Sequence, residues 1–268
     1  MVLKIATWNI NSVRLRIDLV GRFLKEWRPD LLCLQETKCP QGQFPGAPLK
    51  QLGYPHIAEF GQKGYHGVAI VSRLPLTAIA SRQFCGKEDC RHISAVLDLA
   101  KPITIHNLYV PSGGDEPDPK INEKFAHKLR FLDELESWFA ADCVPSGHGG
   151  IVVGDLNIAP FEHDVWSHKE LLKVVSHTPV ETSGLQRAQG AGNWVDLMRQ
   201  HVPLDKKLYT WWSYRAKDWA ESNRGRRLDH IWSTGPLAAT CGRIEVVAGA
   251  RGWPQPSDHV PVLAEFNL

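Results

Sequence analysis

The sequence predicts an α/β protein built as a layered sandwich of β-sheets flanked by helices. Short apolar runs recur along the whole chain, at 3–8, 31–34, 68–71, 93–99, 103–110, 151–153 and 260–266. Two longer stretches, 13–27 and 121–139, repeat apolar residues every three or four positions, which is the spacing of one helix face. Many strands with few helices between them favour sheets with helices on the outside. No break in composition divides the chain, so we expect a single domain over residues 1–268.

Local signals set the expected boundaries of these elements. The first helix should end at 28–30, because Pro29 follows Arg28 and the residue before proline resists helical geometry. Gly154 is expected to end the strand at 151–153. In the last strand, alternate residues should share one face. The glycine- and proline-rich stretches 41–48, 111–119 and 144–150 are expected to be surface loops.

Composition excludes several classes of protein. The 268 residues are 43% hydrophobic and 22% charged, which is typical of a globular protein rather than a collagen, coiled coil, disordered tail or small disulfide scaffold. The net charge of +2 means that any nucleic-acid surface must be local. No apolar run approaches the roughly 20 residues of a membrane span. Lys4 interrupts an N-terminus too short for a signal peptide, and the six cysteines form no Cys-x-x-Cys pair, so we expect reduced thiols and a cytoplasmic location.

Polar side chains collect at the ends of the expected strands, where functional sites are usually built. Three pairs lie two residues apart, Asn9 with Asn11, 107 with 109 and 155 with 157, a spacing that puts both side chains on one face of an extended chain. Asp258 and His259 are adjacent and are expected to reach the site from a loop. The full set is Asn9, Glu36, Tyr109, Asp155, Asn157, Asp229, Asp258 and His259.

This set of carboxylates and amides without thiolates suits a hard divalent cation, Mg²⁺ or Mn²⁺. Such a cation neutralises a phosphate ester, while a base takes a proton from water and further donors stabilise the transition state. Each residue taken alone also has a structural interpretation. Asp and Asn at strand ends often form turns or cap helices, and a tyrosine or histidine is often a core residue.

Seven segments, in order, resemble the bacterial exonuclease III and AP endonuclease family of the exonuclease–endonuclease–phosphatase superfamily. Any one of them is a weak signal, but together they run from residue 8 to 262, nearly the whole chain. They are WNINSVR (8–14), LQETK (34–38), GQKGYHGVA (61–69), NLYVPSG (107–113), GDLNIAP (154–160), RLDHI (227–231) and SDHVPV (257–262).

The resemblance implies a four-layer α/β sandwich of two packed mixed β-sheets with helices outside. It implies that Glu36 is the principal metal ligand, with Asn9, Asp155, Asn157 and Asp258 also in the metal set. It also implies catalytic roles. Asp155 would activate the attacking water, although His259 is the rival base, and Asn157 would orient the phosphate. Tyr109 would contact the phosphate, and Asp229 would orient His259 towards a phosphoryl oxygen.

The substrate class depends on the stretch from Lys206 to Arg227. It holds seven basic against two acidic residues, interleaved with five aromatic ones, a composition that suits a nucleic-acid backbone and an unstacked nucleotide. A solvated loop over core tryptophans is the structural alternative. The resemblance places an abasic-sugar pocket here, with Trp211, Arg226 and Leu228 as DNA-binding residues. Arg226 stands where some relatives carry tryptophan, and Ser112 replaces an asparagine found in some members, which leaves open the balance of exonuclease and endonuclease activity.

We therefore expect a hydrolase that depends on Mg²⁺ or Mn²⁺ and acts in base-excision repair. It would cleave double-stranded DNA 5′ to abasic sites and remove nucleotides from 3′ ends, and it would work as a monomer away from membranes. Two alternatives stay open: the same fold acting on RNA or a phosphorylated small molecule, and a DNA-binding relative without catalysis. The number of bound metal ions also stays open.

Overall fold

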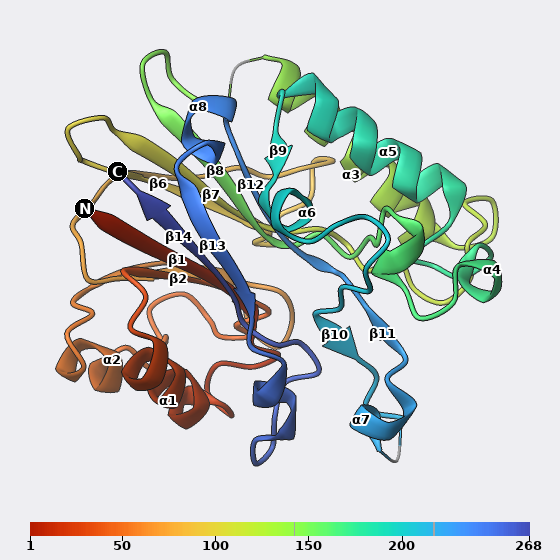
Figure 1. Ribbon diagram of the computed structural model, residues 1–268, viewed down its shortest axis with the longest axis horizontal. Coiled ribbons are helices and arrows are strands. Elements are labelled where there is room, and N and C mark those ends of the chain that lie inside the picture. The colour runs from red at the N-terminus through yellow and green to blue at the C-terminus, as the bar shows by residue number, and fades with distance from the viewer. Residues whose placement is uncertain (142, 217) are drawn as a thin grey trace.

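The computed structural model describes residues 1–141, 143–216 and 218–268. Two six-stranded sheets pack face to face, and helices cover the outer face of each (Figure 1). The predicted four-layer α/β sandwich is confirmed. Within the described ranges, no helix combines the length and apolar character needed to cross a membrane.

The first sheet joins the two ends of the chain. Its central strands β1 and β2 are parallel, and its other neighbouring strands run antiparallel. In spatial order the strands are β13 (Cys241–Val246), β14 (Val262–Asn267), β1 (Val2–Asn9), β2 (Leu31–Gln35), β4 (Val68–Ser72) and β3 (His56–Phe60). The first and last strands of the chain are therefore hydrogen-bonded neighbours.

The second sheet repeats this design, with parallel β7 and β8 at its centre and antiparallel neighbours outside. In spatial order the strands are β5 (Leu76–Ser81), β6 (His92–Leu97), β7 (Ile103–Tyr109), β8 (Gly149–Asp155), β12 (Asp229–Ser233) and β9 (Val195–Asp196). Contrary to expectation, Gly154 does not end its strand: β8 runs on to Asp155, which pairs with Tyr109 on one side and Asp229 on the other.

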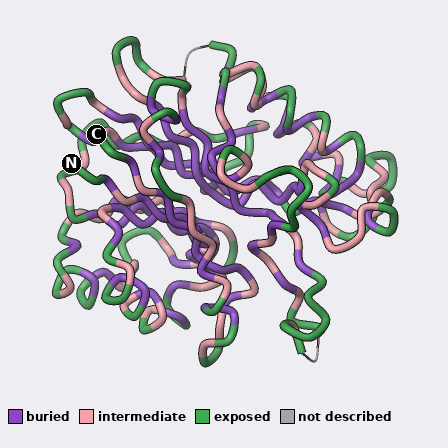
Figure 2. The backbone as a smooth tube through the Cα atoms, in the orientation of Figure 1, coloured by how far each residue is buried: buried purple, intermediate pink, exposed green. Residues whose placement is uncertain are grey.

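Helices bury the outer faces of both sheets. On the first sheet lie α1 (Ile17–Trp27) and α2 (Ala47–Gln51), and on the second α3 (Glu123–Ala140) and α5 (Pro179–Ala191). The shorter helices are α4 (His168–Leu171), α6 (Leu197–His201), α7 (Trp219–Ser222) and α8 (Gly235–Ala238), with 3₁₀ turns η1 (Glu162–Asp164) and η2 (Ala248–Gly252). Buried residues run along the strands and exposed ones along loops and outer helix turns (Figure 2).

Helices α1 and α3 begin later in the chain than the sequence predicted. α1 begins at Ile17, not at Val13, and ends where Arg28 takes a left-handed conformation, as Pro29 predicted. α3 begins after Asn122, whose side chain accepts hydrogen bonds from the first-turn main chain, so Ile121 lies outside the helix and is 74% exposed. The loop expected at 41–48 ends in the first turn of α2.

A small arm projects from the body. It consists of the antiparallel pair β10 (Trp211–Trp212) and β11 (Gly225–Arg226) with α7 between them (Figure 1). Its base returns to the sandwich, because Trp211 forms a bridge with His259 and the main chain of Trp212 binds that of Asp258. The arm therefore borders the strand ends that carry the predicted site.

Candidate active site

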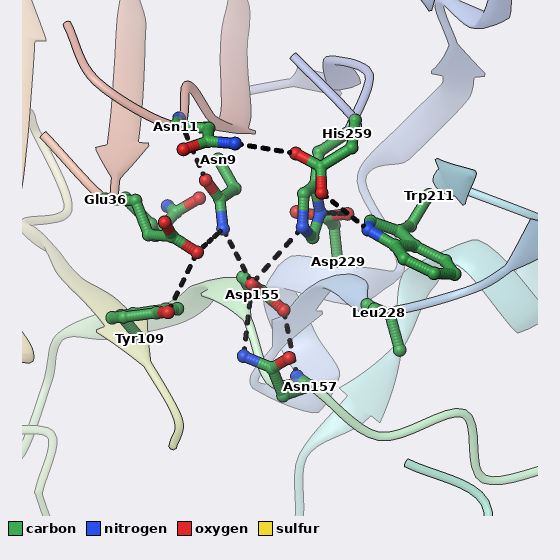
Figure 3. Close-up of polar contacts among 12 residues, drawn as sticks. Asn9, Asn11, Glu36, Tyr109, Asp155, Asn157, Trp211, Leu228, Asp229 and His259 are labelled. Carbon is green, nitrogen blue, oxygen red and sulfur yellow. Dashed lines mark hydrogen bonds and ion pairs between the residues drawn. The ribbon is translucent and has the colours of Figure 1, made fainter. Parts of the chain in front are cut away.

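Sheet topology brings the predicted site residues to one end of the molecule. β1, β2, β7 and β8 all finish at this end, and antiparallel β12 and β14 begin there. Segments more than a hundred residues apart in the chain thus meet between the two sheets. Figure 3 shows the residues pointing toward one another from these strand ends.

Asn9 joins the two carboxylates at the centre of the cluster. Its Nδ2 donates to Glu36 Oε1 at 3.0 Å and to Asp155 Oδ2 at 2.8 Å, and the Tyr109 hydroxyl donates to the same Glu36 oxygen at 2.8 Å (Figure 3). Asn9 and Asp155 are fully buried. Two carboxylates from different sheets are therefore held within reach of one amide.

A lysine that sequence analysis did not single out completes this side of the site. Lys38 Nζ lies 2.8 Å from Glu36 Oε2 and donates to Asn11 Oδ1 at 2.6 Å. Burial would raise the pKa of Glu36, but the Lys38 ammonium and the Asn9 hydrogen bond outweigh it and lower that pKa. Glu36 is therefore ionised at neutral pH. Lys38 could have been identified from the sequence, because it belongs to the family-like segment at 34–38.

A second group surrounds the other face of Asp155. His259 Nδ1 lies 2.8 Å from Asp229 Oδ2, and His259 Nε2 lies 3.6 Å from Asp155 Oδ2. Burial would lower the pKa of His259, but Asp229 and Asp155 outweigh it and raise that pKa to about 10. Burial, reinforced by Asp229 and Glu36 but opposed by His259, raises the pKa of Asp155. The imidazolium of His259 thus lies between the carboxyl groups of Asp155 and Asp229.

Asn157 contacts Asp155, but not from the same face of an extended strand as predicted. Its φ of 54° is left-handed, so the two residues do not share the face of an extended strand. Instead, its main-chain N–H donates to Asp155 Oδ1 at 2.9 Å, and its Nδ2 donates to Val110 O at 2.8 Å. For Asn107 and Tyr109 the predicted shared face is confirmed, since both lie in β7 and both reach the opposite sheet. Asn107 is nevertheless fully buried, and its Nδ2 donates to the main chain of Leu34 at 3.0 Å instead of joining the cluster.

Asp258 lies at the edge of the cluster. Its Oδ2 accepts from Trp211 Nε1 at 2.9 Å, and its Oδ1 accepts from Asn11 Nδ2 at 3.1 Å. Asn11 in turn contacts Lys38, so Asp258 connects to Glu36 through two side chains. The expected loop position for 258 and 259 is confirmed, since both precede β14. Its role as a metal ligand stays a prediction.

The donor set fits a hard cation. Glu36 and Asp155 offer carboxylate oxygen atoms from a partly buried cluster with an excess of negative charge, which is the chemistry that Mg²⁺ and Mn²⁺ prefer. Asn9 turns its Nδ2 toward these carboxylates, and its Oδ1 accepts from the main-chain N–H of Asn11 at 3.0 Å. Asp155, Asp229 and His259 also bring ligand atoms within 4.8 Å of one another. We favour the first group, because both ring nitrogens of His259 already face carboxylates, Nδ1 that of Asp229 and Nε2 that of Asp155.

Two surfaces flank this centre. On the side of Glu36 and Tyr109 opens a cavity of about 610 Å³, whose rim carries the exposed Tyr65. On the other side, Trp211 and Leu228 lie beside Asp229 and His259 (Figure 3). The candidate site residues therefore lie between an open cavity and an aromatic wall.

Arg226 extends the aromatic wall formed by Trp211 and Leu228. Its guanidinium lies over the Trp211 ring, 5.2 Å from the centroid, and its Nη1 donates to Ser176 Oγ at 2.8 Å and Val175 O at 3.0 Å. Arg226 is therefore fixed by neutral partners rather than by a carboxylate.

Only part of the predicted basic stretch faces solvent. Arg227 is fully buried between Asp164 and Asp196, at 2.8 and 2.7 Å, so its charge is neutralised inside the protein. Trp212 is likewise a core residue. The exposed cations described are Lys206, Lys207, Arg215 and Arg224, while Lys217 lies outside the described residues.

The chain belongs to the Endonuclease/Exonuclease/phosphatase family, whose model matches residues 6–259. Among particular proteins, it is 30% identical to exodeoxyribonuclease III of Haemophilus influenzae, over 99% of this chain and the full length of that protein. It resembles the structure of an AP endonuclease from Archaeoglobus fulgidus at 34% identity and a TM-score of 0.90, covering 99% of this chain and all of the other. The 3′ phosphatase NExo from Neisseria, bound to a product DNA hairpin, gives 30% identity and a TM-score of 0.90 over 99% and 100% of the two chains.

Proposed function

We propose that this protein is a metal-dependent DNA phosphodiesterase that cleaves duplex DNA 5′ to abasic sites, leaves a 3′-hydroxyl, and removes nucleotides from 3′ ends. The observation that carries the proposal is the buried cluster in which Asn9 joins Glu36 to Asp155, and Asp155 faces the imidazolium of His259. Full-length similarity to an exodeoxyribonuclease III and an AP endonuclease supports the substrate class.

Each side chain of the cluster has a definite task in phosphodiester hydrolysis. Asp155, whose pKa is raised by burial, is the base that takes the proton from the attacking water. His259, oriented by Asp229, donates a hydrogen bond to a phosphoryl oxygen, where charge builds up in the transition state. Asn157 and Tyr109 orient the phosphate from either side.

Glu36, Asn9 and Asp155 would hold the cation, Mg²⁺ or Mn²⁺, with Asn157 and Asp258 completing the set. When bound, the cation neutralises the phosphate and stabilises the leaving oxygen. Trp211, Arg226 and Leu228 would receive the sugar that lacks a base, because an aromatic ring and an apolar side chain make a surface suited to an unstacked sugar. We also propose a monomer that works in the cytoplasm.

The decisive experiment uses a duplex with a single abasic analogue. With Mg²⁺ the duplex should be nicked 5′ to the analogue, and with EDTA it should stay intact. Cleavage that persists in EDTA would refute the proposal, and the absence of cleavage with either Mg²⁺ or Mn²⁺ would favour the non-catalytic alternative. Competition among abasic DNA, RNA and inositol phosphates tests the remaining alternative, since preferential turnover of either competitor would replace the DNA substrate.

A further inference from the structure

A lysine is buried in the packed face of helix α3. Lys128 has no exposed surface and lies between Phe125 and Leu132 in the apolar stripe of the helix. A buried ammonium is costly unless each of its three N–H groups finds an acceptor. Lys128 Nζ has three: Glu181 Oε1 at 2.5 Å, Asn157 O at 2.8 Å and Ser112 O at 3.2 Å.

Two of these acceptors belong to the loops that carry the proposed active site. Ser112 follows β7, and Asn157 follows β8. Asn157 is held in a left-handed conformation, and its side-chain Nδ2 is already engaged by Val110 O and Asp155. Lys128 Nζ donates to the Asn157 carbonyl, so it fixes the peptide from which that side chain projects.

The third acceptor leads to the aromatic wall. Glu181 lies fully buried in the first turn of α5, where it accepts hydrogen bonds from the main chain of Ser176 and Thr178 and from the Thr178 hydroxyl. Ser176 Oγ accepts from Arg226 Nη1, and Arg226 lies over Trp211. A continuous set of contacts therefore joins Asn157 to the wall.

We propose that Lys128 is a positioning residue for Asn157, and that Glu181 links this position to the Arg226–Trp211 wall. The inference rests on the proposed function and deepens it, because it names the buried pair that sets the orientation of the phosphate relative to the sugar pocket. A displacement of about 1 Å in a group that orients a substrate can reduce turnover about a hundredfold.

The rival explanation is that the pair serves stability alone. Removing one partner of a buried pair leaves an uncompensated charge, whereas removing both often restores stability. The double variant Lys128→Met/Glu181→Gln should therefore have a higher Tm than Lys128→Met. If Lys128 positions Asn157, turnover should stay low in the double variant, since the donor to the Asn157 carbonyl is still missing.

The experiment measures kcat, KM and Tm well below the melting range. Lys128→Met should lower kcat on the abasic duplex roughly 10- to 100-fold with KM changed less than about threefold. Glu181→Gln keeps the lysine and should lose less kcat than Lys128→Met. Leu132→Ala is the matched control: it destabilises the α3–α5 contact through a cavity but leaves the loops intact, so its kcat should stay within about twofold of the parent.

Two results would overturn the proposal: a double variant in which kcat recovers together with Tm, or a Leu132→Ala variant that loses as much kcat as Lys128→Met. The same variants are assayed on bis(4-nitrophenyl) phosphate, a diester that needs no DNA contact. If the parent hydrolyses this diester but not abasic DNA, the proposed substrate fails while positioning is still measured. If Lys128→Met does not fold, Glu181→Gln is compared with Leu132→Ala instead. If these two variants have equal kcat but unequal Tm, the proposed link from Glu181 to the Arg226–Trp211 wall is rejected.

Discussion

At the scale of single residues, the site is organised by hydrogen bonds that leave few side chains free to move. One amide, Asn9 Nδ2, serves carboxylates from two sheets, and one carboxylate, Asp155, is engaged by Asn9 and Asn157 and faces His259. Preorganisation of this kind reduces the reorganisation needed when charge develops on the substrate. The chemistry proposed here thus depends on a few short contacts rather than on the cavity as a whole.

The variant Asp155→Asn tests the role of the proposed base. An amide of the same shape cannot take a proton, so kcat on the abasic duplex should fall about 10²- to 10⁴-fold. Affinity for the uncleaved duplex, measured by fluorescence anisotropy in EDTA, should stay within about threefold of the parent. Asp133→Asn, on the exposed face of α3, is the matched control and should leave kcat unchanged. A loss of less than tenfold in Asp155→Asn would remove this residue from the role of base.

At the scale of elements, sequence patterns located the strands better than they located the turns between them. Apolar runs identified β1, β2, β4, β6, β7, β8 and β14, because buried strands need continuous or alternating apolar residues. The exposed edge strand β5 was missed, since most of its residues face solvent and carry no such pattern. The left-handed Asn157 was also missed, because tertiary contacts with Val110 and Lys128 hold that conformation.

The candidate site residues could be proposed from the sequence mainly because strand ends and family motifs coincide there. The contacts among them could not be predicted from spacing, since pairing across two sheets depends on register. Lys128 left one signal, a charge inside an apolar helical stripe, and Arg227 left none that distinguished it from its exposed neighbours. The basic stretch therefore predicted a larger charged surface than the arm presents.

Gly154 allows the main chain of strand β8 to approach that of strand β7 closely. Its φ is +143°, and a Cβ at this position would lie 1.9 Å from the carbonyl oxygen of Leu108 in β7. Gly154→Ala should therefore lower the free energy of unfolding by roughly 2–4 kcal/mol, measured by urea titration. Gly190→Ala, in α5 with open space around it, should leave stability unchanged or raise it by up to about 1 kcal/mol. Equal stability of the two variants would contradict this view of the β7–β8 contact.

The arm should contribute to DNA affinity through its exposed cations. Binding of a duplex weakens with salt at a slope of about −0.9 per phosphate neutralised. The double variant Arg215→Ala/Arg224→Ala should reduce the magnitude of that slope by about 1 to 2, with affinity measured at several salt concentrations in EDTA. Lys25→Ala/Lys50→Ala removes two exposed cations from α1 and α2 and should leave the slope unchanged. An unaltered slope in the arm variant would show that the arm does not contact the backbone.

At the scale of the whole molecule, the two ends of the chain lie in one sheet, and residues from both sheets complete the site. Met1 and Leu268 exchange main-chain hydrogen bonds, and β1 lies between β14 and β2. This arrangement supports the prediction that residues 1–268 form one domain, for which calorimetry should record a single unfolding transition. It also ties activity to global folding, because separating the sheets would part Glu36 from Asp155.

Buried histidines should make this fold sensitive to acid. Burial lowers the pKa of His106 to about 4 and that of His230 to about 3, from 6.5 in the unfolded chain. Below pH 6.5 the unfolded chain binds protons that the folded protein excludes, so their contribution to stability is complete above that pH and is lost as pH falls toward 4. A shift of this size corresponds to about 3 kcal/mol for His106. Urea titrations between pH 7 and 4 should show this decline, and His106→Gln should make it shallower, because one proton-binding group is then absent from the unfolded chain. A decline of unchanged steepness in that variant would exclude His106 as a source of the acid sensitivity.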